Sequence, residues 1–171
     1  MSDRERAPSN AGATIPRFDK RGVMNSRSPA WARIPILVAR LIFAAVFAMA
    51  MTFKFGDIGE TATYIAAAGF PAALFLAWVA AFFELALVLC FLTGAFFTEA
   101  ALAAAAYVLF LGFAFHGPVH WTGNQAEFGF FVDHFTFLAG LLFAAAHGPG
   151  DVLALTRARL IGPGPNRRFR G

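Results

Sequence analysis

Three residues that could do chemistry lie inside long apolar runs of the sequence. Glu84 and Tyr107 lie near the middle of two such runs, and Arg40 lies toward the start of another. A charged side chain at the centre of a membrane helix costs about 2.5–3.5 kcal/mol, so each needs a partner or a function. In one interpretation Glu84 handles protons or anchors a ligand, with Arg40 and Tyr107 as partners. In the other, an internal Arg40–Glu84 pair fixes helix packing.

A second polar group is expected where several apolar runs end at the same, outer face of a membrane. Histidines and carboxylates are common metal ligands. However, Gly117-Pro118 interrupts the helix between His116 and His120, so the spacing is not the two-histidine helical face of a zinc enzyme. We therefore predict a hydrogen-bonded layer or a small-molecule site, with no metal, formed by Lys54, His116, Asp133 and His134, and with His120 and Glu127 in the neighbouring loop.

The sequence carries no recognisable catalytic set of its own. It has no nucleophile–base combination, no phosphate-binding glycine loop and no dinucleotide fingerprint. Cys90 is the single cysteine, which excludes an intramolecular disulfide and argues against a thiol oxidoreductase with a CxxC pair. Any chemistry is therefore expected to come from a bound cofactor or a partner protein.

The elements that position these residues are predicted to be membrane helices. Of the 171 residues, 58% are hydrophobic and only 14% are charged, whereas soluble domains carry about 25% charge. Each of four apolar segments approaches the ~20 residues that a helix needs to cross a bilayer. In hydrocarbon the backbone must satisfy its own hydrogen bonds, which favours helices. We predict an all-α integral membrane protein, a four-transmembrane-helix bundle with spans at 34–55, 72–92, 98–116 and 129–147.

The distribution of basic residues predicts the orientation. Seven of the 14 basic residues precede Ile34 and five follow Leu155, whereas 117–128 contains no Lys or Arg. The positive-inside rule then places both termini in the cytoplasm. The polar segment 1–33 is predicted to be a disordered basic tail, 34–155 the membrane domain and 156–171 a second basic tail. Because the basic ends flank apolar runs, they indicate topology and not a nucleic-acid partner.

An ordered series of short motifs resembles the DoxX family of small bacterial membrane proteins. The resemblance runs from Arg40 to Leu155. Three places depart from the family pattern. Glu99 stands near a usual basic residue, His134 stands where a Lys is usual, and Ala154-Leu155-Thr156 stands where Ser-Leu-Asp is usual. The matching positions, in chain order, are Arg40, Lys54, Gly69-Phe70-Pro71, Glu84, Leu92-Thr93-Gly94, His116, Gly140-Leu141-Leu142 and Gly148-Pro149-Gly150.

The resemblance implies a four-helix bundle in the bacterial cytoplasmic (inner) membrane. Its relatives include a subunit of an archaeal thiosulfate:quinone oxidoreductase, and others associate with sulfur or oxidative-stress enzymes. The first hypothesis is therefore a redox-associated membrane subunit that binds a quinone-like molecule through Glu84, Arg40 and Tyr107. The second is a non-enzymatic scaffold that recruits partner proteins. The third is a small-solute transporter, for which four helices would have to assemble into a homo-oligomer.

Overall fold

The computed structural model describes residues 30–155, which contain helices and turns and no strand. Four of these helices are long and apolar enough to cross a membrane, which confirms the predicted all-helical, multi-pass architecture. The predicted tails, 1–33 and 156–171, lie almost wholly outside the described residues. The four long helices are α1 (Arg33–Gly56), α3 (Ala73–Thr93), α4 (Phe97–His116) and α5 (Gln125–His147).

Two segments predicted as connections contain further helix. The linker after α1 forms α2 (Ile58–Ala67). The Asp57 side chain caps α2 by accepting a hydrogen bond from the Glu60 backbone N–H at 2.8 Å, an arrangement that satisfies an unpaired helix donor. The last long helix starts at Gln125 and not at 129, and so takes in Glu127. The short 3-10 helices η1 (Ala30–Ala32) and η2 (Pro118–His120) complete the described part of the chain.

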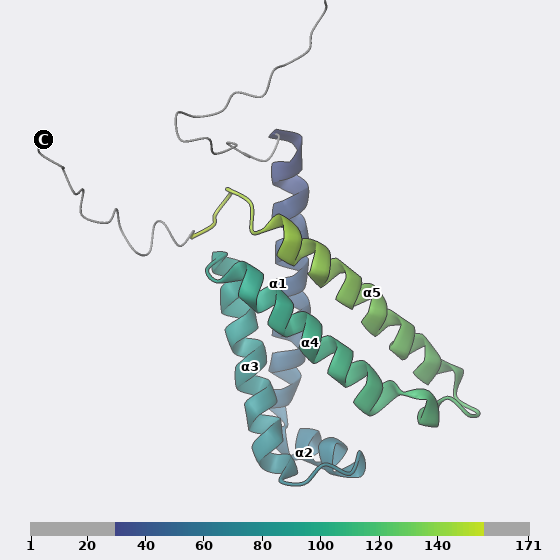
Figure 1. The fold of residues 1–171 in the computed structure, drawn as a ribbon. Helices are drawn as coiled ribbons and strands as arrows, with labels where there is room; N and C mark the ends of the chain where they lie inside the picture. Colours follow the sequence, from purple (N-terminus) through teal and green to yellow (C-terminus); the bar gives the residue numbers. More distant parts are fainter. Residues whose placement is uncertain (1–29, 156–171) are drawn as a thin grey trace, which may run out of the picture.

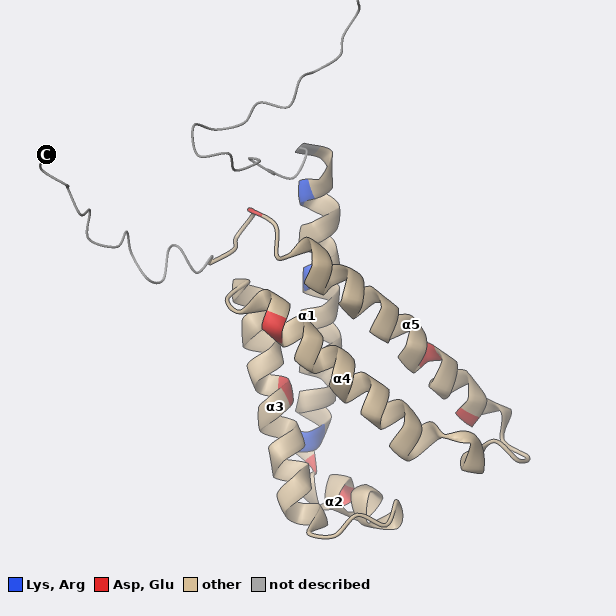
Figure 2. Cartoon of the chain, in the orientation of Figure 1, with Lys and Arg blue, Asp and Glu red and all other residues tan. Residues whose placement is uncertain are grey.

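The long helices are arranged as two antiparallel pairs (Figure 1). α1 packs along α3, and α4 packs along α5. We call the end with the α3–α4 turn and residues 148–155 the proximal end, and the end with α2 and η2 the distal end. Toward the distal end α4 and α5 lead away from α3 and α1. Charged residues are sparse on all four long helices (Figure 2), as expected for surfaces that face lipid.

The hydrophobic core joins the two pairs toward the proximal end. Phe43 and Phe47 of α1 contact Phe91 of α3, with ring centroids 5.8 Å apart in each case, and both also contact Phe137 of α5. Buried alanines of α4, among them Ala101, allow close helix approach here. Large apolar side chains elsewhere are exposed, and a bilayer is the solvent that suits them.

Arg40 ties the segment after α5 to the proximal end. Its side chain is only 1% exposed. Its guanidinium donates hydrogen bonds to one backbone carbonyl at the end of α3 and three in the C-terminal segment, at 2.8–3.2 Å. The accepting residues are Leu92, Pro149, Val152 and Leu153. The buried cation is thus stabilised by backbone carbonyl dipoles, one from the C-terminal end of α3 and three from the non-helical segment after α5.

Gly94, in the α3–α4 turn, tests how tightly this segment is held. Its φ is +71°, and a Cβ there would lie 3.0 Å from the Ala154 Cβ. We expect Gly94→Ala to lower the free energy of unfolding by about 1–3 kcal/mol, because both the strained φ and the contact are unfavourable. Gly129→Ala is the control, since nothing lies within 4 Å of its Cβ position. Equal SDS-unfolding midpoints in detergent for the two variants would contradict the close packing.

Candidate functional site

An inner polar cluster, formed by Lys54, Glu84 and Tyr107, lies at the middle of the bundle. Glu84 is 1% exposed on α3. Its Oε1 accepts hydrogen bonds from the Lys54 ammonium and from the Tyr107 hydroxyl, each at 2.9 Å. Glu84 Oε2 is buried and has no hydrogen-bond partner among the described residues. The cluster therefore neutralises the Glu84 charge and leaves one acceptor oxygen unused.

This cluster brings together Glu84 and Tyr107, as expected, but Arg40 is not part of it. The predicted Arg40–Glu84 pairing is absent among the described contacts, because Arg40 donates to backbone carbonyls at the proximal end. Lys54, which was expected in the outer layer, pairs with Glu84 instead. Helical side chains lean toward the N-terminus of their own helix. In the antiparallel α1 and α3, the side chains of Lys54 and Glu84 therefore lean toward each other.

A cavity of about 1040 Å³ opens between the two helix pairs on the distal side of the cluster. Lys54 and Tyr107 line its inner end, and His116 and His134 line its distal part. Since Tyr107 and His116 are nine residues apart on α4, the cavity extends about 13 Å along that helix. Its size is at the upper end of the range for small-molecule sites.

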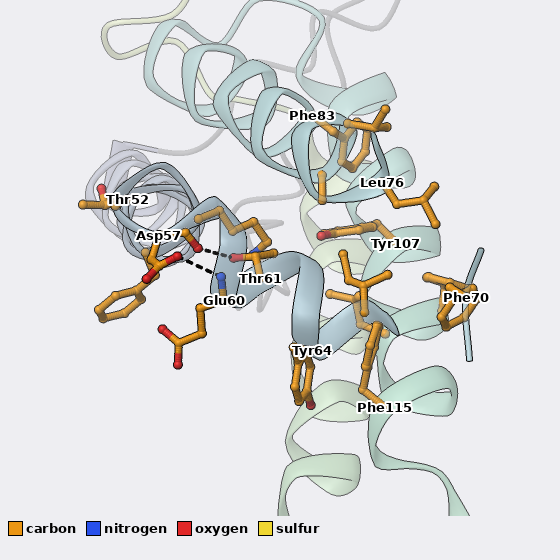
Figure 3. A pocket seen from close by; sticks show the side chains of 18 of the residues that line it. Thr52, Asp57, Glu60, Thr61, Tyr64, Phe70, Leu76, Phe83, Tyr107 and Phe115 are labelled. Atoms are coloured by element: carbon orange, nitrogen blue, oxygen red, sulfur yellow. Dashed lines mark hydrogen bonds between the residues drawn. The ribbon is translucent and has the colours of Figure 1, made fainter. Parts of the chain in front are cut away.

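The cavity has one polar wall and one apolar wall (Figure 3). Thr52, Asp57 and Glu60 lie on one side, at the α1–α2 junction, and the rings of Phe70 and Phe115 lie on the other. α2 and the turn that follows it close the distal part of the cavity through aromatic contacts with α4. The Tyr64 ring stacks on the Phe115 ring with centroids 5.0 Å apart, and Phe70 contacts Phe115 at 5.9 Å.

A distal histidine pair, His116 and His134, joins α4 to α5. Their ring centroids are 5.1 Å apart. His116 Nδ1 lies 2.6 Å from Glu127 Oε2, and His134 Nδ1 lies 2.7 Å from the Phe130 carbonyl. Gly112 provides the space, because a Cβ there would lie 3.1 Å from the His134 Cβ. Nδ1 of each ring is thus engaged, and neither Nε2 forms a hydrogen bond with another residue of the described range 30–155.

The predicted outer layer is therefore only partly assembled. His116 and His134 meet, Lys54 belongs to the inner cluster, and Asp133 is exposed and does not line the cavity. No group of three or more potential metal ligands lies among the described residues. Glu127, which was expected in the loop beside this layer, lies in the first turn of α5 and pairs with His116. Sequence analysis missed the role of Asp57 as a helix cap. The Asp57-x-x-Glu60 spacing is that of a helix N-terminal capping box and could have indicated α2.

These features define a multi-pass membrane protein with a cavity that is polar at its inner end and enclosed by two helix pairs. The DoxX family model matches residues 36–117, a range that contains most of α1 and all of α2, α3 and α4. This match supports assignment of the chain to the DoxX family. The match includes Lys54, Glu84, Tyr107 and His116, whereas Glu127 and His134 lie beyond it. No curated protein and no solved structure matches the chain.

Proposed function

We propose that this protein is the membrane subunit of a redox system and binds a quinone-like molecule in the cavity. The observation that carries the proposal is the inner polar cluster at the end of an apolar-walled cavity. A lysine ammonium has three N–H donors, and Glu84 accepts one of those of Lys54. The other two are available to a ligand oxygen such as a quinone carbonyl.

The remaining lining also suits such a ligand. The rings of Phe83, Phe110 and Phe115 offer apolar surface to a flat ring and its hydrocarbon chain. Asp57 and Glu60 place negative charge along the polar wall, which disfavours an anionic ligand. A bound quinone would supply the two-electron, two-proton chemistry that the chain itself lacks. The residues of the inner cluster would orient it and hold protons.

The proposed setting is the bacterial inner membrane with both termini in the cytoplasm, supported by the positive-inside rule. The cavity then opens toward the outer side. Soluble redox proteins, including sulfur or oxidative-stress enzymes, are the proposed partners. They would supply the groups that exchange electrons with the bound quinone.

Quinone retention tests the proposal. We expect the protein purified from native membranes in mild detergent to retain quinone, and Tyr107→Phe and Glu84→Gln to retain about tenfold less. Each change weakens or removes the hydrogen bond from Tyr107 to the Glu84 carboxylate, which holds the inner polar cluster in place. Loss of one hydrogen bond to a charged group is worth about 1.5 kcal/mol, which corresponds to that factor. Asp133→Asn is the control, because Asp133 is exposed and outside the cavity. Extracted quinone is quantified by mass spectrometry.

The same samples distinguish the alternative functions. Retained partner proteins without quinone, equal in wild type and Glu84→Gln, would contradict the quinone site and support a scaffold. Quinone retained equally by all variants would show that it binds with the lipids and not in the cavity.

A further inference from the structure

The distal histidine pair lies in the same cavity as the inner polar cluster, but it is too far away to contact the same ligand ring. The two ends lie about 13 Å apart along α4, whereas a single aromatic ring is about half that width. The distal pair therefore needs its own chemical explanation.

The geometry around His116 prepares one nitrogen for proton transfer. Glu127 Oε2 accepts from Nδ1 at 2.6 Å, which fixes the neutral tautomer with the proton on Nδ1. Nε2 is then the basic nitrogen of a ring that lines the cavity. The Trp121 indole N–H donates to the His116 carbonyl at 2.8 Å and holds the end of α4.

The charged and titratable groups around His116 come from each neighbouring element. α5 contributes Glu127 and His134, and the turn before it carries His120 on η2. From α2, Tyr64 stacks on the adjacent Phe115. Burial and the Glu127 carboxylate both raise the pKa of Tyr64, which places the Glu127 charge within electrostatic reach of α2. Further along the cavity lie the side chains of Lys54, Asp57, Glu60 and Tyr107.

We propose that His116 is the group through which the cavity exchanges protons with solvent at the distal end of the bundle, with Glu127 as its positioning residue. The proposal rests on the proposed function, since exchange matters only for a ligand that gains and loses protons. When a bound quinol is oxidised to the quinone, its two electrons pass to the electron-transfer group of a partner redox protein, and each proton released by a quinol hydroxyl moves through the cavity to His116 Nε2. From there it leaves to solvent, and Glu127 stays a carboxylate throughout. His134, 5.1 Å away between centroids, offers a second imidazole beside it.

A ligand-free labelling experiment in lipid nanodiscs tests the histidine itself. Diethylpyrocarbonate acylates an unprotonated imidazole nitrogen, and mass spectrometry locates the product. We expect His116 to be labelled, because its Nδ1 is bonded to Glu127 and its ring lines the cavity. Glu127→Gln should lower the labelling rate of His116 several-fold, because the amide no longer fixes the proton on Nδ1 and the orientation of the ring. His147 is the internal control, since its Nδ1 bonds the Phe143 carbonyl at the opposite end. Asp133→Asn is the control on the same helix.

A second measurement adds a short-chain quinol. We expect its affinity for wild-type protein to change between pH 5 and 8, and His116→Gln to remove that change. A pH dependence unaltered in His116→Gln, or a labelling rate unaltered in Glu127→Gln, would overturn the proposal. If quinol binds to no variant, the proposed function is wrong, and the labelling experiment still decides whether Glu127 positions the His116 ring.

Discussion

Replacing Arg40 by alanine should destabilise the protein more than any other single substitution at its proximal end. The change leaves four carbonyls without their donor, in a region where Arg40 is 1% exposed. Hydrogen bonds to charged groups contribute about 1.5–3 kcal/mol each, and unsatisfied buried groups add a cost. We expect the free energy of unfolding to fall by about 3–5 kcal/mol, measured by SDS titration in detergent.

Arg33 provides the matched control for this prediction. It forms an ion pair with Asp151, which lies in the same C-terminal segment, but both side chains are over 40% exposed. Exposed pairs contribute about 0–1 kcal/mol, so Arg33→Ala should be nearly neutral. Arg40→Lys should lie between the two, because an ammonium keeps the charge but has fewer donors than a guanidinium. If Arg33→Ala and Arg40→Ala were equally stable, the hydrogen bonds of Arg40 would not hold the segment.

Lys54→Met is expected to be the second most damaging change, because it leaves the Glu84 carboxylate buried without its cation. Breaking a buried ion pair from one side costs about 3–5 kcal/mol. The Lys54 side chain is 20% exposed and that of Glu84 only 2%. The opposite single change, Glu84→Gln, should therefore cost less, since water can reach the unpaired ammonium.

The double variant Lys54→Met/Glu84→Gln separates stability from ligand binding. With both charges removed, we expect most of the stability lost in Lys54→Met to return, a non-additive result in SDS titration. Quinone retention should stay low, because the donors are still missing. Additive destabilisation in the double variant would mean that the two side chains do not depend on each other.

The sequence predicted the spans well because hydrophobic length determines them. A bilayer of fixed thickness demands about 20 apolar residues, and glycine or proline marks each connection. The structural ends of α1, α3 and α4 lie within one residue of the predicted ones. α5 begins four residues early because Gln125 and Glu127 are polar and carry no apolar signal, although the backbone there is already helical.

The candidate site was predicted less well because the sequence does not show how far one helix is shifted along its neighbour. The prediction allowed Arg40 to pair with Glu84. In the structure, Arg40 lies level with the end of α3, where it bonds the Leu92 carbonyl, and α1 projects beyond α3 at the proximal end (Figure 1). This offset brings Lys54 toward Glu84. The offset is fixed by hydrogen bonds from Arg40 to the backbone carbonyls of Pro149, Val152 and Leu153. These residues are uncharged and follow the last span, so nothing in their side chains indicates this contact.

The uneven packing of the two helix pairs has a mechanical consequence. Phe43 and Phe47 of α1 hold the two pairs together near one end through their contacts with Phe137 of α5, so this aromatic cluster is the point about which the pairs can rotate. A rotation of a few degrees there displaces the far helix ends by more than it displaces the core. The width of the cavity would then be set by residues that never contact the ligand. A change in the volume of a ring in the aromatic cluster would alter which ligand sizes fit, and it would leave the inner polar cluster intact.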